Sequence, residues 1–229
     1  MHLRLEGSGF SKLEVSLKSL LFFSLAWVGA RAIGDSLIYL YFWNSGVSAL
    51  EIVFSVATWF AAPLIGLLLL NNRKGLGSRL FFKAALLLGA FSFALLAALP
   101  PSGLLLGGFS FISGLSGLFF WLPFNELFFA RSKDRAAFAG AAYSGIGPSV
   151  GVVLPLLAGT VSSIFGFPAL FVLSGVCALA AWIALPKMDD FTQDFDLRKS
   201  LSDAKEMGAL FFWKELFSRA FQPQSCWLQ

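Results

Sequence analysis

The sequence predicts an all-α integral membrane protein, a bundle of six transmembrane helices with both termini in the cytoplasm. Apolar residues make up 57% of the 229-residue chain and charged residues only 13%, whereas a soluble domain has about 25% charged residues. The apolar residues form runs of about the 20 residues that cross the hydrocarbon of a bilayer. Lys and Arg recur in alternate connectors between these runs, which is the pattern of a multi-pass protein of the cell membrane.

Six apolar runs predict the spans. They are rich in Leu, Phe, Ala and Gly and are apolar nearly all round, as lipid-exposed helices are. A β-barrel would instead show short segments of alternating polarity. The predicted spans are residues 20–43, 52–70, 80–99, 104–129, 138–165 and 167–185.

The connectors predict the orientation. Connectors 71–79 and 130–135 carry several Lys and Arg residues, as do the segments before the first span and after the last. Connectors 44–49, 100–103 and 162–166 contain none. Basic residues in short loops mark the cytoplasmic face, so we expect the basic connectors and both termini to be cytoplasmic.

The N-terminal segment, residues 1–19, is expected to be cytoplasmic and to precede a membrane domain at 20–186. Its basic residues, the apolar run and Val28-Gly29-Ala30 loosely resemble a cleaved signal peptide. The apolar stretch continues past Ala30 to Trp43, however, which favours a retained first span.

The C-terminal segment, residues 187–229, differs in composition. An acidic stretch at 189–196 leads into apolar residues at helical spacing and then Leu210-Phe211-Phe212-Trp213. Charged residues at 214–219 interrupt this run before it could span a bilayer. We predict a cytoplasmic amphipathic helix on the inner membrane surface, in a tail or linker-like segment.

Composition also argues against several functions. The net charge of +4 is spread over separate connectors, so no nucleic-acid partner is expected. His2 is the only histidine, and Cys177 and Cys226 form no disulfide framework. Asp35 is the only aspartate in the predicted spans, which argues against an intramembrane aspartyl protease. We expect no enzyme, no metal and no cofactor.

Arg31 and Asp35 are the strongest candidates for a functional site. They lie four residues apart in the first span, on one face of the helix. A charge at the centre of a spanning helix costs about 2.5–3.5 kcal/mol on insertion scales, so both should face the bundle interior or a cavity. Two interpretations stay open: an ion pair that fixes helix packing, or a substrate or ion site in which Asp35 gains and loses a proton.

Other polar residues are weaker candidates. Asn125 and Glu126 lie near the inner end of the fourth span, and Glu126 could pair with Arg131 or Arg135. For Glu126 this structural network is favoured over binding. Glu51 falls at the outer edge of the second span, where a solvated position is expected.

Glycines and prolines mark the fourth and fifth spans. In the fourth span small residues allow close helix contact, and the residues concerned are Gly103, Gly107, Gly108, Gly114 and Gly117. In the fifth span prolines remove backbone donors and predict a bend, either a passive kink or a hinge that moves during a cycle. The candidates for this bend are Gly147, Pro148, Gly151, Pro155 and Gly159.

These features together resemble the N-terminal six-helix half of a major facilitator superfamily transporter. Asn72-Arg73-Lys74-Gly75 is similar to that family's Gly-x-Leu-x-Asp-Arg-x-Gly-Arg-Lys signature, with Asn in place of Asp and no basic pair after the glycine. Pro155-Leu156-Leu157-Ala158-Gly159 resembles its Gly-Pro-x-x-Gly-Gly element, and Phe165-Gly166-Phe167 the lead into the sixth span. The resemblance covers residues 20–201. It makes Asn72, Arg73, Gly75 and Arg79 candidates for a cytoplasmic gating loop.

The resemblance implies a function. The first, second, fourth and fifth spans would border a central cavity that contains Arg31 and Asp35. The expected activity is secondary transport of a small solute across the bilayer by alternating access, coupled to protons or sodium. Such transporters bind substrate between two six-helix bundles, so a homodimer or a second six-helix half is expected. The alternative is a non-transporting membrane scaffold or partner subunit, in which the two charges would be sealed in a dry pair.

Overall fold

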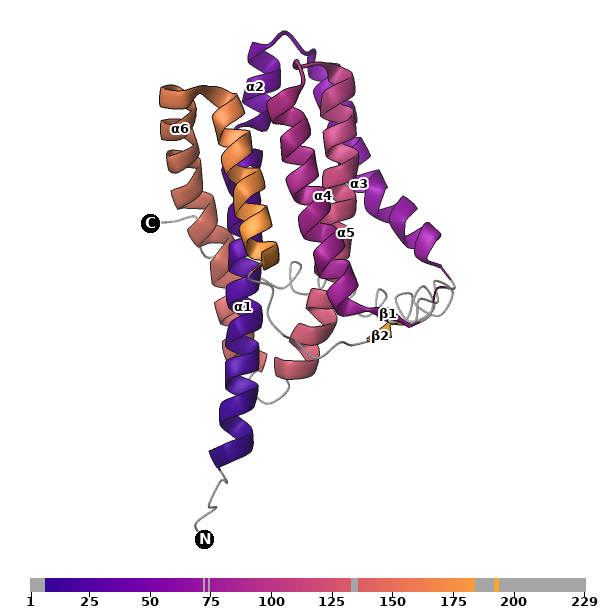
Figure 1. Ribbon diagram of the computed structural model, residues 1–229, viewed down its shortest axis with the longest axis vertical. Coiled ribbons are helices and arrows are strands. Elements are labelled where there is room, and N and C mark those ends of the chain that lie inside the picture. The colour runs from indigo at the N-terminus through magenta and orange to yellow at the C-terminus, as the bar shows by residue number, and fades with distance from the viewer. Residues whose placement is uncertain (1–6, 72, 74, 133–135, 184–191, 194–229) are drawn as a thin grey trace, which may run out of the picture.

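The described part of the protein, in a computed structural model, comprises residues 7–71, 73, 75–132, 136–183 and 192–193. Within it, long helices run side by side along the longest axis of the molecule (Figure 1). The helices are α1 (Gly7–Asp35), α2 (Ile38–Asn44), α3 (Ala49–Leu70), α4 (Ser78–Ala98), α5 (Gly103–Ser132) and α6 (Ala136–Ile183). Two short strands, β1 (Leu76–Gly77) and β2 (Thr192–Gln193), complete the described elements.

Five segments of the described chain are long and apolar enough to cross a membrane. They are Leu17–Asn44, Ala49–Leu70, Ser78–Ala98, Gly103–Ser132 and Tyr143–Trp182. The predicted class of protein, a helical multi-pass membrane protein, agrees with this. The segments also agree with the predicted spans, except that the fifth covers two of them.

The first predicted span is interrupted. Helix α1 begins at Gly7, upstream of the predicted boundary, and ends at Asp35, while α2 begins only at Ile38. Leu37 between them has φ −117° and ψ 6°. Gly34 has poor helix propensity, and the Ser36 hydroxyl donates to the carbonyl of Ile33 at 3.2 Å, a local bond that competes with the helical pattern. The predicted span over 20–43 agrees with the apolar segment Leu17–Asn44, but the helix within it is interrupted at Ser36 and Leu37.

Helix α6 contains the fifth and sixth predicted spans, joined by a single residue. Its one non-helical residue is Gly166, with φ 80° and ψ 168°, a conformation that side chains with a Cβ rarely adopt. The ribbon of α6 turns back on itself (Figure 1). Pro168 follows, and proline suits the first turn of a helix because its missing N–H is not needed there. We call residues 136–165 the first arm of α6 and residues 167–183 the second arm.

Aromatic side chains dominate the core. Helix α1 packs against α6, α3 against α5, and α4 against both α5 and α6. Between α1 and α5 the rings of Trp27 and Phe120 stack with centroids 4.0 Å apart and an interplanar angle of 8°. Phe23 meets Phe82 of α4 edge to face at 5.2 Å. These contacts tie three helices together with little conformational freedom.

Some glycines permit close helix approach and others do not. A Cβ on Gly114 would overlap the backbone carbonyl of Trp59, so α3 and α5 could not approach as they do with any larger residue. Gly103 similarly leaves room for a side chain of α3, that of Glu51. For the other three predicted contact glycines the expectation was wrong, because a Cβ there would meet nothing within 4 Å; these are Gly107, Gly108 and Gly117.

The surface of α3 is strongly apolar and matches a lipid-facing helix. Large apolar side chains project from most of its length, whereas about half of the span in α4 is buried between its neighbours. The exposed large side chains of α3 are Leu50, Val53, Phe54, Trp59, Phe60, Leu64, Ile65, Leu68 and Leu69. Such a surface would be unfavourable in water and is expected in lipid.

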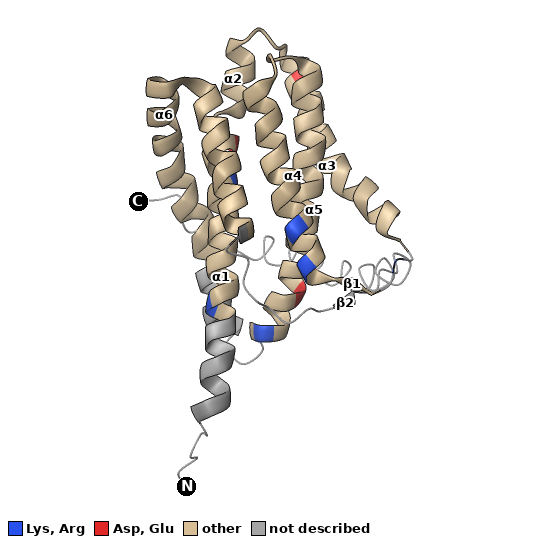
Figure 2. Ribbon diagram, in the orientation of Figure 1, with Lys and Arg blue, Asp and Glu red and all other residues tan. Residues whose placement is uncertain are grey.

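One end of the bundle is basic. Lys and Arg gather toward the end at which β1 and β2 lie (Figure 2). There β1 and β2 pair antiparallel, Leu76 opposite Gln193 and Gly77 opposite Thr192. Strand β1 in the connector after α3 and strand β2, which follows α6 in the sequence, therefore lie at the same end of the molecule. The amphipathic helix predicted for the tail falls outside the described residues.

Candidate functional site

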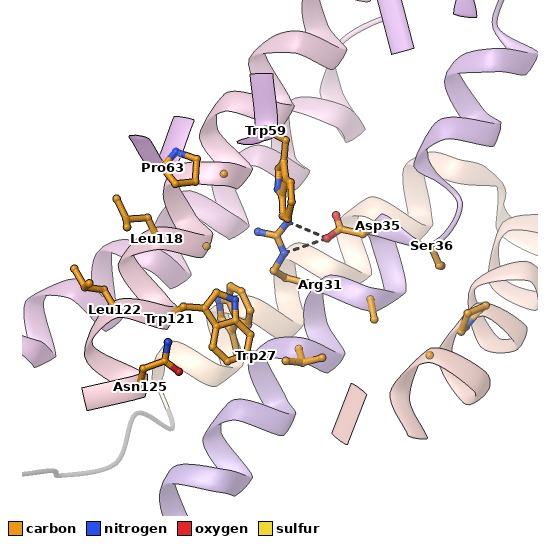
Figure 3. A pocket seen from close by; sticks show the side chains of 16 residues that line it. Trp27, Arg31, Asp35, Ser36, Trp59, Pro63, Leu118, Trp121, Leu122 and Asn125 are labelled. Atoms are coloured by element: carbon orange, nitrogen blue, oxygen red, sulfur yellow. Dashed lines mark hydrogen bonds and ion pairs between the residues drawn. The ribbon is translucent and has the colours of Figure 1, made fainter. Parts of the chain in front are cut away.

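A cavity of about 730 Å³ lies among α1, α3, α5 and the first arm of α6. Most of its walls are apolar, and Figure 3 shows Arg31 at its centre, directed toward Asp35. Ser36 and Asn125 add further polar groups to the lining. Within the described chain no lining residue comes from α4 or the second arm of α6. The lining helices correspond to the four spans that the resemblance places around a central cavity.

The guanidinium of Arg31 is held firmly. Its Nε and Nη2 donate to Oδ2 of Asp35 at 3.1 and 2.9 Å. Nη1 donates to the backbone carbonyl of Ser113 at 3.1 Å, and Nη2 also donates to the Ser113 hydroxyl. Arg31 is only 9% exposed, and its Cζ lies 5.3 Å from the centroid of the Trp27 ring. The residue thus links α1 to α5 and lies against an aromatic wall.

Asp35 is placed differently from its partner. Its side chain is 34% exposed and forms part of the cavity lining. Both hydrogen bonds from Arg31 reach Oδ2, while Oδ1 is buried and receives no hydrogen bond from the described residues. Leaving a buried acceptor unsatisfied costs about 1–3 kcal/mol. The pair therefore combines a sealed cation with a carboxylate that has unused hydrogen-bonding capacity.

Tryptophans form much of the wall, and sequence reasoning missed them. Trp27, Trp59 and Trp121 all line the cavity. Trp27 and Trp121 meet edge to face with centroids 5.3 Å apart. The sequence spacing does indicate them: Trp27 lies four residues before Arg31, and Trp121 lies four residues before Asn125. Residues four apart share a helix face, so the polar candidates could have identified their aromatic neighbours.

Of the weaker polar candidates, only Asn125 lies at the cavity. Asn125 lines the cavity, whereas Glu126 is exposed and does not. Glu51 forms a capping box at the start of α3: its carboxylate accepts from the Ser48 N–H at 2.9 Å and the Ser48 hydroxyl at 2.7 Å. The expected boundary position of Glu51 is confirmed. Arg135, one proposed partner of Glu126, lies outside the described residues.

The gating-loop candidates lie away from the cavity. Arg73 and Arg79 are exposed, and Asn72 is outside the described residues. Gly75 has φ 67°, a left-handed conformation that glycine adopts without strain. None of the described members of this group lines the cavity. A gating role for them stays a prediction.

Two of the five bend candidates of the fifth span lie at the cavity. Gly151 and Pro155 line the cavity; Gly147, Pro148 and Gly159 do not. All keep helical backbone angles, because the non-helical backbone of α6 is confined to Gly166. The reversal of the chain therefore lies beyond the predicted bend, and a hinge at the prolines stays a prediction.

Among the described residues, no three His, Cys, Asp or Glu side chains come together as a metal site would require. No protein-family model matches the chain, and no curated protein matches it. The resemblance to major facilitator transporters therefore rests on the motifs and loop pattern of this sequence, and the function has to be argued from the cavity itself.

Proposed function

We propose that this protein forms a solute pathway, as one six-helix half of a secondary transporter that works by alternating access and is coupled to protons or sodium. The proposal rests mainly on the position of Asp35. Its carboxylate is partly exposed and lines a cavity of about 730 Å³ inside an apolar helical bundle. Ionisable groups within spans are costly, and they mark substrate or ion pathways in membrane proteins.

The proposed topology has six crossings, with the two arms of α6 crossing in opposite directions. Helix contacts support this arrangement. Gly29 of α1 faces Leu154 of the first arm, whereas Gly175 of the second arm faces Ala90 of α4. The two arms thus occupy different places in the bundle. An even number of crossings puts both termini on one side, and the basic connectors favour the cytoplasm for that side.

The alternative, a scaffold without transport, requires only a sealed ion pair. Arg31 meets that description, since it is buried and makes four hydrogen bonds, to Asp35 and Ser113. Asp35 does not, because a third of its side chain is exposed at the cavity. A pair that served packing alone would need no adjoining cavity, so the arrangement favours transport.

A partner is part of the proposal. The cavity is open, and its charged pair would be unfavourable against lipid. A second six-helix bundle placed over it would complete the enclosure, as in transporters that bind substrate between two bundles. The second bundle would be another copy of this chain or a separately encoded half.

The test uses a variant that fills the cavity. Gly117 lines the cavity, and a Cβ there would meet nothing within 4 Å, so Gly117→Leu should occupy the pathway without straining the helices. Gly108 on the same helix is equally unobstructed but exposed and outside the lining, so Gly108→Leu is the matched control. Proteoliposomes with an imposed proton or sodium gradient would be offered a mixture of small solutes, and uptake would be measured by mass spectrometry.

We expect gradient-dependent uptake with the unaltered protein and with Gly108→Leu, and none with Gly117→Leu. Uptake that persists in Gly117→Leu would place the pathway elsewhere. A folded, reconstituted protein that takes up no solute under either gradient would favour the scaffold.

A further inference from the structure

We infer that the cavity binds an organic cation, specifically a protonated amine attached to an apolar or aromatic body. This inference rests on the proposed function, in that it treats the cavity as the substrate site, and it names the class of substrate. It follows from how the hydrogen-bonding capacity of Arg31 and Asp35 is divided.

The charge of the site is balanced before any ligand binds. Arg31 and Asp35 are the charged residues of the lining, and they are paired through Nη2 and Oδ2 at 2.9 Å. A ligand is therefore not drawn in by an excess of one charge. Whether the site prefers a cationic or an anionic ligand depends on which of the two residues, Arg31 or Asp35, still has unused hydrogen-bonding groups.

Arg31 has almost none to offer. A guanidinium has five N–H donors, and Arg31 makes four hydrogen bonds, to Asp35 and to the carbonyl and hydroxyl of Ser113. The residue is 9% exposed, and one side of it is covered by Trp27. An anionic ligand would have to displace Asp35 or break the link to α5. The site is therefore poorly arranged for a carboxylate or a phosphate.

Asp35 keeps the capacity that Arg31 lacks. A carboxylate can accept several hydrogen bonds, yet Arg31 uses Oδ2 alone, and Oδ1 has no donor among the described residues. Oδ1 is buried in this conformation, so a ligand reaches it only if the Asp35 side chain shifts toward the cavity while Oδ2 stays on Arg31; a half-turn about Cβ–Cγ would merely exchange the two oxygens. A ligand N–H would then satisfy an acceptor that is otherwise unfavourably placed. The group that fits is an ammonium.

The aromatic walls suit the same ligand. A cation within about 6 Å of an indole face is attracted to it. Trp27 is occupied by Arg31 and by the stacked ring of Phe120. Trp121 already meets Trp27, Phe120, Phe124 and Tyr143 edge to face. Trp59, which is 39% exposed, remains available. Trp59 belongs to α3 and Trp121 to α5, and both side chains line the cavity (Figure 3).

The volume limits the size of the ligand. Pockets for drug-sized molecules measure about 300–1,000 Å³ and are mostly apolar with a few polar groups. The cavity, at about 730 Å³, falls in this range. An amine with a phenyl group would occupy well under half of it, so the volume admits such a ligand and leaves room for a larger apolar body.

The test compares probes that differ in charge and donor capacity. 4-Phenylbutylammonium carries a charged donor; 5-phenylpentanoate has the same apolar body with a negative charge; and the N,N,N-trimethyl derivative of the first keeps the positive charge without any N–H. Binding would be measured by equilibrium dialysis on the full chain in nanodiscs of zwitterionic lipid. Empty nanodiscs correct for partition into lipid, and Gly117→Leu with its control Gly108→Leu identifies binding in the cavity.

We expect the ammonium to bind the unaltered protein and Gly108→Leu but not Gly117→Leu, the trimethyl probe to bind about tenfold more weakly, and the carboxylate to show no binding that Gly117→Leu removes. Cavity-dependent binding of the carboxylate at equal or higher affinity would overturn the inference. Ammonium binding that is the same in Gly117→Leu, or absent from the unaltered protein, would overturn it as well.

Further variants test the two named contacts. Asp35→Asn should abolish ammonium binding, although it strands a buried Arg31 and could unfold the protein. Trp59→Leu avoids that risk and should weaken binding about tenfold, while Trp43→Leu, at an exposed tryptophan outside the lining, should not change it. Equal affinities of Trp59→Leu and Trp43→Leu would contradict the aromatic contact. Ammonium binding without gradient-dependent uptake would refute transport and leave this inference standing. Uptake of anions without ammonium binding would support transport and refute this inference.

Discussion

Arg31 donates two hydrogen bonds to a single oxygen of Asp35, at 2.9 and 3.1 Å, and leaves the other carboxylate oxygen without a donor among the described residues. Arg–carboxylate pairs are frequently bidentate, with two parallel N–H···O bonds to both oxygens. Two hydrogen bonds to one oxygen fix the guanidinium, while the other carboxylate oxygen can still accept a hydrogen bond.

The ion pair should show strong energetic coupling. Asp35→Leu and Arg31→Met each remove one partner and strand the other, and breaking a buried pair costs about 3–5 kcal/mol. Losing Asp35 should cost more, because it strands Arg31, which is 9% exposed. Losing Arg31 leaves an Asp35 side chain that is 34% exposed, and it should cost at or below the lower end of this range. The double variant should regain most of the stability. Thermal unfolding in mild detergent measures this, and purely additive effects of the two changes would show that the pair is not coupled.

Close packing of α3 on α5 should depend on Gly114. In Gly114→Ala the new Cβ would overlap the Trp59 carbonyl and force the helices apart, and overpacking of this kind costs about 1–3 kcal/mol. Gly107→Ala on the same helix meets nothing within 4 Å and should be neutral, or stabilising by up to about 1 kcal/mol through helix propensity. The melting temperatures of both variants provide the comparison. Equal destabilisation by the two would mean that α5 does not approach α3 as described.

The sidedness of the connectors should follow their charge. Single cysteines replace Arg73 in a basic connector, and Ser45 and Ser102 in uncharged ones, in a chain whose Cys177 and Cys226 are changed to Ala; all three positions are exposed. In intact cells an impermeant thiol reagent should label the cysteines at 45 and 102 and not that at 73. Labelling at 73 alone would invert the proposed orientation.

Assembly should accompany activity. An open cavity with a charged pair is unfavourable against lipid, so we expect a two-fold dimer or a complex with a second half, and symmetric closure makes the dimer the simplest form. Mass measured in nanodiscs, with solute uptake measured on the same preparation, tests this expectation. A strictly monomeric sample that moves solute would show that six helices enclose a complete pathway.

The sequence predicted those features that depend on spacing along one helix. Arg31 and Asp35 pair because residues four apart share a face, and Glu51 lies at the start of α3 because the apolar run begins there. The capping box that Glu51 forms with Ser48 was not predicted. Features that depend on neighbouring helices could not be read in this way. Both Gly114 and Gly117 line the cavity, yet a Cβ on Gly114 would meet the backbone of α3 whereas one on Gly117 would meet nothing within 4 Å. That difference is set by the path of α3.

The same distinction applies to the site. Charge singled out Arg31 and Asp35, but sequence reasoning did not single out the tryptophans. Their role became visible only when α1, α3 and α5 brought them to one cavity. The break after Asp35 was missed because the run 20–43 is apolar on both sides of it, although Gly34, Asp35 and Ser36 at the break itself are not. Apolarity measures affinity for lipid rather than continuity of a helix.

The reversal at Gly166 bears on how the chain enters the bilayer. In the proposed topology the two arms of α6 are joined by one residue, so no polar loop has to be carried across the membrane between them. They would then insert together as a helical hairpin, in one step rather than two. Gly166 has φ 80°, and a β-branched residue there would be strained. A variant such as Gly166→Val would thus be expected to fail during biogenesis, at the translocation machinery, before any defect in transport could be seen.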